Sequence, residues 1–491
     1  MTAGDPLATR VHDLLSETIR IYQDSASAQE WLHDHLARLT GPLRLAVAGP
    51  PGAGKSTLVN ALVGESVAPV ESDHGTSFLT WYLDGAAPRA QVCPWYGAPY
   101  ELPLHRGEQG LRLAGPFGQQ VGAAGDADEI HHVQVEWPSR SLRHTHLLDT
   151  PGLPPSDAGW EAEWGIWQDA DAVLFLSRTL ASGDLSRLPP ARGGWAAATL
   201  PLQLVVVLAR ADETGGGRVD ALLAAKQLAR RRRREPDLAV ACQDAVAVSG
   251  LIGYAARTLR QDEFDALALL AGQPRTALEP HLLSVDRFRA ADQSVPLERE
   301  WRERLLDKLG LTGVRLATTL VRSGSGDPSA LAEALMRHSG LAELQATVQD
   351  LFSTRRAVLK ARTALLAVEQ LAHHEPCAQS AYLLSRVEQL VSAAHEFREL
   401  RLLAALRARR AGLPVEMAAE ARQLAGGTGA SVFERLGLPV DAPPEQLWSQ
   451  AASAIRRWRQ QAQQPGQPAN QRQAAQVVLR SCEAILQELA S

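Results

Sequence analysis

The sequence predicts an α/β domain, built as a mostly parallel sheet flanked by helices, together with an α-helical bundle domain. Three observations predict this fold class. Short apolar runs alternate with helical stretches in the first half of the chain, which is typical of a parallel sheet. One of these runs, 43–48, is followed at once by a glycine-rich loop and a helix. Beyond residue 254 strand alternation ends, and Ala, Leu, Glu and Arg dominate.

Length and composition limit the class of protein. A chain of 491 residues is too long for one core, so we expect two or three domains. The apolar fraction of 45% and the charged fraction of 21% are those of a soluble globular protein, and the net charge of −5 argues against nucleic acid as a partner. The four cysteines lack metal or disulfide spacing, and no apolar run approaches the ~18 residues of a membrane span. We therefore expect a cytoplasmic protein, with any membrane contact peripheral and on the inner face.

The remaining elements follow from periodicity. An N-terminal helix of about six turns or more is predicted from the stripe Val11, Leu15, Ile19 and Tyr22. Strands are expected at 43–48, 78–83, 89–95, 100–104, 130–137, 144–148, 172–176 and 202–208. Residues 245–250 fit the last strand and the backbone loop that follows it. Helices are expected at 56–62, 219–234, within 254–338 and at 341–352, and apolar stripes at 383–397 and 475–489 predict helices of a bundle.

The stretch after the first strand is a phosphate-binding loop by its pattern of glycines, lysine and serine. Glycines let consecutive backbone N–H groups point at phosphate oxygens, the lysine reaches the terminal phosphates, and the serine hydroxyl holds Mg²⁺. A chance match in a turn is the alternative, which the flanking strand and helix disfavour. The residues predicted to bind the nucleotide are Gly49, Pro50, Pro51, Gly52, Ala53, Gly54, Lys55, Ser56 and Thr57, and Lys55 and Ser56 also have predicted catalytic roles.

A polar loop at 67–76 is where a magnesium-sensing switch should lie. A P-loop GTPase needs a second hydroxyl on the metal that is present only when the γ-phosphate is bound. Thr76 is well placed to supply this hydroxyl, with Thr80 as the fallback. The alternative is an ordinary Gly-Thr turn that leads into the next strand and has no role in metal binding.

The strand at 144–148 runs into Asp149-Thr150-Pro151-Gly152. An aspartate at the C-terminal end of a parallel strand can hold Mg²⁺ through water, and a glycine three residues later offers its N–H to the γ-phosphate. Ser56, Thr76 and Asp149 are therefore the predicted metal ligands. Thr76 and Gly152 join the predicted catalytic residues, and Asp149 joins the nucleotide-binding ones.

The base-binding residues are predicted at the ends of the last two strands. GTPases carry Asn/Thr-Lys-x-Asp here, and this chain has Ala209-Arg210-Ala211-Asp212. Asp212 would accept two hydrogen bonds from the guanine edge, and Arg210 would stack over the base. Ser249 and Gly250 follow the last strand and border the base. GTP with Mg²⁺ is the predicted ligand, although Ala209 removes one supporting contact.

Basic clusters and histidines outside these motifs have either an ordinary structural role or a functional one. The run 230–234 ends a predicted helix before Pro236, which favours a solvated face over a binding patch. The arginines of the bundle part either dock on anionic lipid headgroups or form solvated faces; they are Arg407, Arg409, Arg410, Arg456, Arg457 and Arg459, the last three beside Trp458. The strand histidines do not have the spacing of converging metal ligands; they are His131, His132, His144 and His146.

Together these motifs resemble a bacterial dynamin-like GTPase. The resemblance rests on the loop with the Thr57-Leu58-Val59-Asn60-Ala61-Leu62 that follows it, on Pro69 seven residues ahead of Thr76, and on Asp149 to Gly152. Segments 210–223, 248–251, 257–261 and 283–288 are similar to one actinobacterial branch, the isoniazid-induced proteins. The resemblance extends over nearly the whole chain.

This resemblance implies a domain organisation and a set of partners. It implies a GTPase domain at 41–355 with a helical insertion at about 254–338, a neck- or trunk-like bundle at 356–491, and an N-terminal helix within 1–40 that packs with the bundle. The implied activity is GTP hydrolysis that drives remodelling or maintenance of the bacterial membrane. The implied partners are a second copy across the nucleotide face, a second dynamin-like protein of the IniA type, and an anionic phospholipid membrane surface.

Two residues of the loop depart from the eukaryotic dynamins. Pro51-Gly52 stands where those proteins carry a Gln-Ser pair that helps to place the attacking water and a monovalent cation. Hydrolysis is then slow, or needs groups from a partner. An alternative to the enzyme is thus a GTP-binding, hydrolysis-poor assembly subunit that scaffolds a longer dynamin-like partner. A GTPase of the ribosome or tRNA-modification type is weakened by the acidic net charge and the absence of an RNA-binding module.

Overall fold

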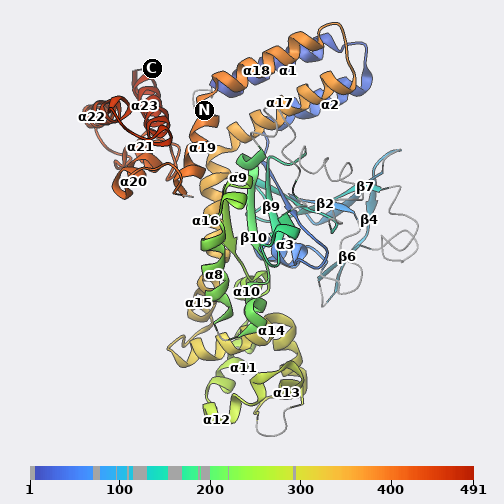
Figure 1. Cartoon of the computed structure of the whole chain (residues 1–491). Helices are drawn as coiled ribbons and strands as arrows, with labels where there is room; N and C mark the ends of the chain where they lie inside the picture. Colours follow the sequence, from blue (N-terminus) through green and yellow to red (C-terminus); the bar gives the residue numbers. More distant parts are fainter. Residues whose placement is uncertain are drawn as a thin grey trace.

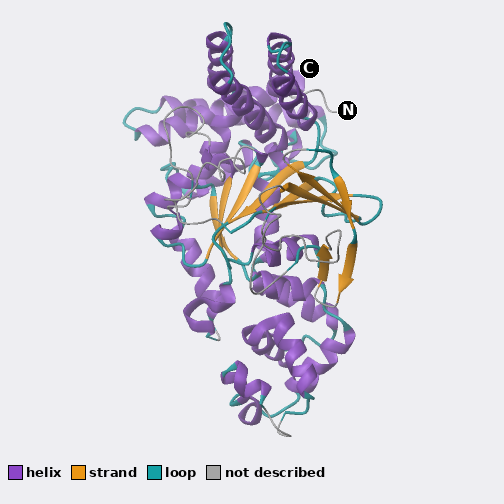
Figure 2. Ribbon diagram, turned by 90° about the vertical axis from the view of Figure 1, so that its right-hand side faces the viewer, coloured by secondary structure: helices purple, strands orange, loops and turns teal. Residues whose placement is uncertain are grey.

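The structure is a computed structural model in which residues 6–69, 78–94, 97–107, 110–113, 130–152, 169–185, 188, 200–218, 220–290, 295–407 and 409–490 are described. It confirms the predicted fold class. A sheet with helices on both of its faces forms the middle of the molecule, and the C-terminal region is helical (Figures 1 and 2).

The main sheet has nine strands within the described residues, in the order β11-β10-β9-β1-β8-β2-β7-β3-β4. Strands β1, β8, β9, β10 and β11 run parallel to one another. Strand β2 pairs antiparallel with β8 and parallel with β7, and β3 pairs antiparallel with β7 and β4. The bounds are β1 Leu43–Ala48, β2 Leu79–Asp84, β3 Arg89–Pro94, β4 Tyr100–Leu102, β7 Ile130–Trp137, β8 Thr145–Asp149, β9 Ala172–Ser177, β10 Leu204–Leu208 and β11 Asp244–Ala247.

The central strands are buried on both faces, which is why they read as continuous apolar runs. Along β1, Ala46 and Ala48 belong to the apolar core on one face of the sheet, and Leu45 and Val47 belong to the core on the other. Two differences from the prediction concern the strands. The strand predicted at 202–208 begins only at Leu204, because η1 (Leu200–Gln203) is a 3₁₀ turn, and a separate hairpin of β5 (Leu104–Gly107) and β6 (Gly110–Leu113) was not expected.

Helices cover both faces of the sheet. Helices α3 and α16 contribute to one core, and α8, α10, α11, α14 and α15 contribute to the other. The helices α11 to α14 extend to the end of the molecule opposite the N-terminal helices (Figure 1). The bounds are α3 Lys55–Val63, α5 Ser182–Leu185, α7 Thr214–Gly217, α8 Ala221–Arg232, α9 Pro236–Ala241, α10 Gly250–Arg257, α11 Gln261–Ala271, α12 Arg275–Leu278, α13 Val285–Arg289, α14 Arg299–Arg322, α15 Pro328–Ser339 and α16 Leu341–Leu351.

The N-terminal segment corrects the prediction of one long helix. Residues 6–38 form two helices, α1 (Pro6–Ile21) and α2 (Ala26–Arg38). Ser25 separates them, because its extended backbone turns the chain while its hydroxyl accepts a hydrogen bond from the N–H of Ala28. Both helices pack against α17 (Arg356–His374), and α1 also packs against α18 (Ser380–Ala393).

The helices after residue 355 contribute to two apolar cores. Helices α17 and α18 share one core with α1, α2 and the first half of α19 (His395–Arg407). The second half of α19 shares the other core with α20 (Val415–Leu424), α21 (Val432–Leu436), α22 (Pro444–Gln463) and α23 (Ala469–Ala490). The predicted stripe at 383–397 lies in the first core, although the helix breaks at Ala394, whose backbone is extended.

Buried charges join α17 to the sheet. The Nζ of Lys360 donates to the carboxylate of Asp171 at 3.0 Å, and both side chains are almost fully buried. The hydroxyl of Thr363 donates to the same carboxylate, which also accepts the backbone N–H of Arg44. Since Asp171 directly precedes β9, α17 is held at the N-terminal end of this central strand. The loop after β1 lies at the opposite end of the strands.

Several of the basic side chains predicted as clusters have acidic partners. In the run 230–234, Arg232 pairs with Glu235 and Asp237, and Arg233 pairs with Asp244. Arg407 pairs with Asp244 as well, at 2.7 Å, so the second helical core also has an ionic contact with the sheet. Among the described residues, no helix is long and apolar enough to cross a membrane.

The buried His35 predicts a pH dependence of stability. Burial lowers the pKa of His35 to about 3, with further lowering by Arg38, so the ring is neutral when folded. The unfolded chain takes up the proton below about 6.5, hence the stabilisation is present above that pH and is lost as the pH falls towards 3. We expect this group alone to remove about 2 kcal/mol of unfolding free energy at pH 5.

The matched pair His35→Phe and His33→Phe tests this prediction by urea unfolding at pH 7 and pH 5. His33 lies on the same helix but is exposed. The loss of stability on acidification should shrink in the His35 variant and stay unchanged in the His33 variant. Equal losses in both variants would show that His35 does not carry the effect.

Candidate functional site

The loop between β1 and α3 has the backbone that its glycines predict. Gly49, Gly52 and Gly54 have φ of 147°, 69° and 93°, values that favour glycine. A Cβ on Gly49 would come within 2.5 Å of the carbonyl oxygen of Leu176, so glycine is also required there for close passage beside β9. Gly54 is the N-cap of α3, and the helix therefore opens directly out of the loop.

Lys55 is enclosed by the loop. Its Nζ donates to the carbonyl oxygens of Gly49 and Pro50, each at 3.2 Å, and the side chain is buried. Burial lowers the pKa of the ammonium group, and the charge of Asp149 opposes that shift. The cation is therefore held in the centre of the loop, where terminal phosphates would need it.

Ser56 and Asp149 meet although 93 residues separate them. The hydroxyl of Ser56 donates to Oδ2 of Asp149 at 2.6 Å. The parallel pairing of β1 with β8 sets Val47 opposite Asp149, so the carboxylate emerges beside the start of the loop. A hydroxyl and a carboxylate are hard oxygen ligands, so this pair fits a hydrated Mg²⁺.

Of the two threonines predicted as candidates for the switch, the described structure includes only Thr80. Thr76 lies outside the described residues. Thr80 lies in β2, opposite Asp149 in the antiparallel register, and its buried hydroxyl donates to the carbonyl of Phe78. Thr80 is therefore next to the carboxylate in the sheet, with its hydroxyl engaged by its own strand.

The sequence analysis did not identify two residues that support the loop structurally, Asn60 and Thr150. The buried Asn60 accepts the backbone N–H groups of Val67 and Ala68 and donates to the carbonyl of Ala68, which fixes the chain as it leaves α3. Thr150 donates to the carbonyl of Val47 at 3.0 Å and thus ties the Asp149 segment to β1. Both roles depend on contacts that no local sequence pattern marks, so neither could be predicted.

Gly152 lies directly against the centre of the phosphate loop. An added Cβ on Gly152 would be 2.6 Å from Cγ, 2.8 Å from Cα and 2.9 Å from Cβ of Pro51. No side chain fits at 152 while the proline stands where it does. The predicted sensor glycine and the residue that departs from the eukaryotic pattern are thus in contact.

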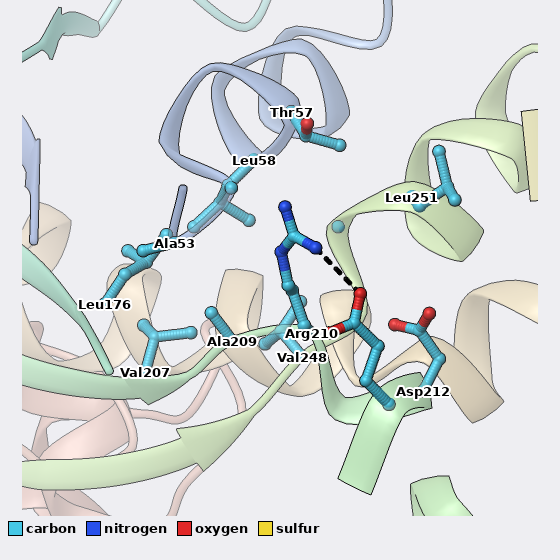
Figure 3. Close-up of a pocket in the computed structure, with 13 residues that line it drawn as sticks. Ala53, Thr57, Leu58, Leu176, Val207, Ala209, Arg210, Asp212, Val248 and Leu251 are labelled. Carbon is cyan, nitrogen blue, oxygen red and sulfur yellow. Dashed lines mark hydrogen bonds and ion pairs between the residues drawn. The ribbon is translucent and has the colours of Figure 1, made fainter. Parts of the chain in front are cut away.

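A pocket of about 200 Å³ lies next to the loop, between α3 and the ends of β9, β10 and β11 (Figure 3). Its lining combines the loop with the predicted base-binding residues, and Ala209 forms part of it without a polar group. Figure 3 shows the Arg210 side chain extending across this pocket towards Thr57 and Leu58. The structure therefore brings Arg210, Asp212 and Gly250 to one pocket with Ala53, Gly54 and Thr57.

The polar groups of this pocket are held by local contacts. Burial raises the pKa of Asp212, and a hydrogen bond from Ser249 opposes the shift. Arg210 has a left-handed backbone, with φ of 50°, and its guanidinium donates to Glu213 at 2.8 Å. Ser249 is also the N-cap of α10, because its hydroxyl accepts the N–H of Ile252.

A helix from the region predicted as an insertion contacts the loop that carries the predicted base-binding residues, which the sequence did not indicate. Helix α14 donates from the hydroxyl of Thr312 to the carbonyl of Asp212 at 3.2 Å. The guanidinium of Arg315 on the same helix donates to the carbonyl of Gly217 at 2.9 Å. The position of Asp212 thus depends on an element about 100 residues further along the chain.

Comparisons with known proteins support a GTPase. The family model described as a 50S ribosome-binding GTPase matches residues 44–80. The isoniazid-induced protein IniC of Mycobacterium tuberculosis is 35% identical over 98% of this chain and 99% of its own length. A bacterial dynamin-like protein of Nostoc punctiforme is 27% identical over 33% of this chain and 26% of its own.

Among solved structures, an oligomerised bacterial dynamin pair is similar over 99% of this chain and 74% of the other, with 14% identity and a TM-score of 0.31. That score is too low for the arrangement of the domains to be compared.

The contact between Gly152 and Pro51 predicts the effect of one methyl group. Gly152→Ala should lower nucleotide affinity by about tenfold, because a clash inside 3 Å forces the loop or the 149–152 segment to move. Replacing Pro51 by glycine in the same chain should restore part of the affinity. Gly183→Ala is the control, since nothing lies within 4 Å of a Cβ there. Full affinity in Gly152→Ala, measured by titration with fluorescent GDP, would contradict the proposed tight contact.

Proposed function

The chain belongs to the bacterial dynamin-like GTPases of the IniC type, and from this premise we propose that it binds GTP with Mg²⁺ and hydrolyses it to drive membrane remodelling or maintenance at the bacterial cell membrane. One observation carries the proposal. The hydroxyl of Ser56 and the carboxylate of Asp149 are in hydrogen-bond contact at the mouth of the loop that encloses Lys55. This arrangement supports a metal-assisted nucleotide site rather than two unrelated turns.

Each group of residues would bind a different part of the nucleotide. The backbone N–H groups of residues 49–56 and the ammonium of Lys55 would bind the phosphates. Ser56, together with Asp149 and Thr76, would hold Mg²⁺, which neutralises phosphate charge when bound. Gly152 would offer its N–H to the γ-phosphate. Arg210, Asp212, Ser249 and Gly250 would bind the base, with the ionised form of Asp212 accepting the donors of guanine.

The contacts between the domains suggest how the nucleotide could act on the helices. Strand β9 contributes Leu176 to the base pocket at its C-terminal end, and Asp171 at its other end bonds to Lys360 of α17. Movement of the loops on loss of the γ-phosphate would therefore reach α17 through a buried strand and tilt the helical part. A homodimer across the nucleotide face and a longer dynamin-like partner of the IniA type belong to the same proposal, as does a peripheral contact with anionic phospholipid on the cytoplasmic side.

The contact between Pro51 and Gly152 favours a second candidate function, that of a GTP-binding assembly subunit. The ring of Pro51 occupies the space beside Gly152, and it carries no group that could orient water or bind a cation. A chain built in this way would hold GTP and hydrolyse it poorly, and it would act as an assembly subunit beside its partner. The ribosomal alternative draws on a family-model match that is confined to residues 44–80, around the loop common to P-loop proteins.

GTP turnover separates the two candidates. We expect single-turnover and steady-state hydrolysis to be measurable and to rise on addition of anionic liposomes. Lys55→Ala should weaken GTP binding by about 100-fold, because charge-assisted contacts to the terminal phosphates are lost. If hydrolysis stays negligible under every condition while GTP still binds tightly, the assembly subunit is the correct function. Unchanged GTP affinity in Lys55→Ala would refute the phosphate-loop assignment itself.

The base preference has its own test. Asp212→Ala should reduce the preference for GTP over ATP by about 100-fold, since two charge-assisted hydrogen bonds to guanine are removed. Competition of GTP and ATP against fluorescent GDP measures this ratio. Asp220→Ala is the matched control, because Asp220 is exposed in the same segment and lies outside the pocket. An unaltered ratio in Asp212→Ala would rule out its role in base recognition.

A further inference from the structure

A second cavity lies in the helical region, far from the phosphate loop in the fold. It has a volume of about 510 Å³ and lies between α19, the turn that follows it, and α23. Arg398 and Arg401 of α19, Arg410 of the turn and Arg480 of α23 all line it. We call it the arginine groove. Its volume is within the range of about 300–1,000 Å³ for sites that bind small molecules.

The arginine groove is strongly and uniformly basic. No aspartate or glutamate is among the described residues that line it. Within the described parts of the chain, no ion pair involves Arg398, Arg401 or Arg480, in contrast to Arg407 and Arg457, which pair with Asp244 and Glu420. Partial burial and the neighbouring charge of Arg398 lower the pKa of Arg401. Cations gathered in this way repel one another, and an anion placed among them would relieve that repulsion.

The carboxylate that directly follows Arg398 in the sequence is already engaged. Glu399 is buried, and it accepts hydrogen bonds from Arg435 at 2.5 Å and from the hydroxyl of Ser481 at 2.6 Å. His395, which also lines the groove, bonds to the same hydroxyl. Glu399 is thus held in a buried hydrogen-bonded network with Arg435, Ser481 and His395.

The turn after α19 is held in an uncommon conformation that brings Arg410 to the groove. The backbone N–H of Arg409 donates to the carbonyl of Leu406 and that of Arg410 to the carbonyl of Ala405, which is the bonding pattern of a Schellman motif. The left-handed position of that motif usually holds glycine, but here Arg409 occupies it, with φ of 55°. Asn470 at the start of α23 donates to the carbonyl of Arg410 and fastens the turn. Such a strained position is maintained only by its surroundings.

The rest of the groove is apolar or bears amides. Leu402, Ala405 and Val477 contribute apolar surface, and Gln473 and Gln476 contribute amide groups. A ligand that suits this surface combines a compact anionic group with an uncharged, partly apolar portion. Guanidinium groups bind phosphate oxygens through paired, directional hydrogen bonds, which makes phosphate the best match for several arginines at one site.

We propose that the arginine groove between α19 and α23 is a binding site for a phosphate group carried by a small amphipathic or glycerol-like moiety. The source is either the headgroup of an anionic phospholipid or a soluble organic phosphate. A lipid source would give the phospholipid contact of the proposed function its site, and to that extent the inference rests on the proposed function. Because the site requires neither GTP nor hydrolysis, its failure is distinguishable from a failure of GTP binding or turnover.

The test uses the full chain loaded with GDP and Mg²⁺, so that the phosphate loop is occupied. One arm measures co-sedimentation with vesicles of phosphatidylglycerol and phosphatidylcholine, against vesicles of phosphatidylcholine alone. The other arm measures binding of sn-glycerol 3-phosphate by calorimetry. The double variant Arg401→Gln/Arg480→Gln should bind at least about tenfold more weakly in the arm that corresponds to the true source, since two charge-assisted contacts are lost.

The control is Arg456→Gln/Arg472→Gln, which removes the same charge from exposed positions of α22 and α23 outside the groove. Gln473→Glu is a second groove variant at an exposed position, and it should weaken binding without altering the fold. Binding that depends on the groove in the vesicle arm identifies a lipid headgroup, and in the calorimetric arm a soluble phosphate. If the groove variants bind like the wild type in both arms, or if the control loses as much as they do, the proposal is wrong.

Discussion

The parallel register of β1 with its neighbours β8 and β9 is the constraint on which the site depends. It sets Val47 opposite Asp149 on one side and opposite Leu174 on the other. Parallel strands end at the same edge of a sheet, so the phosphate loop, the carboxylate and the wall of the base pocket emerge together there. A shift of one residue in this register would turn Asp149 to the opposite face and separate it from Ser56.

Buried ion pairs at the starts of β9 and β11 hold the helices in place relative to the sheet. Asp171 ends the connection into β9 and holds Lys360 of α17, and Asp244 begins β11 and holds Arg233 and Arg407. Burying such pairs costs desolvation, so they are poor sources of net stability, but removing one partner leaves an uncompensated charge. Their arrangement therefore specifies one relative placement of sheet and helices more than it strengthens the contact.

The candidate site departs at Pro51 from the eukaryotic dynamins and at Ala209 from the general GTPase motif, and the expected consequences differ. Ala209 is an apolar part of the pocket that Asp212 and Arg210 also line, so one polar contact to a bound base would be missing there. Pro51 acts through space instead. Its ring contacts Gly152 and so couples the phosphate loop to the segment that would sense the γ-phosphate. Under the proposed function, the departure at Ala209 would affect base selectivity and the one at Pro51 the speed of hydrolysis.

The sequence by itself determined the fold class, the strands that flank the motifs and the residues at the strand ends, because these follow from local periodicity and from glycines that need left-handed backbone. It did not reveal the break at Ser25, where a single side-chain cap ends one helix and starts another. Long-range contacts were decided only by the tertiary structure: the closeness of Gly152 to Pro51, the bond from Thr312 to Asp212, and the gathering of four arginines between α19 and α23. Such contacts join residues far apart in the chain, and no local pattern encodes which helices will pack side by side.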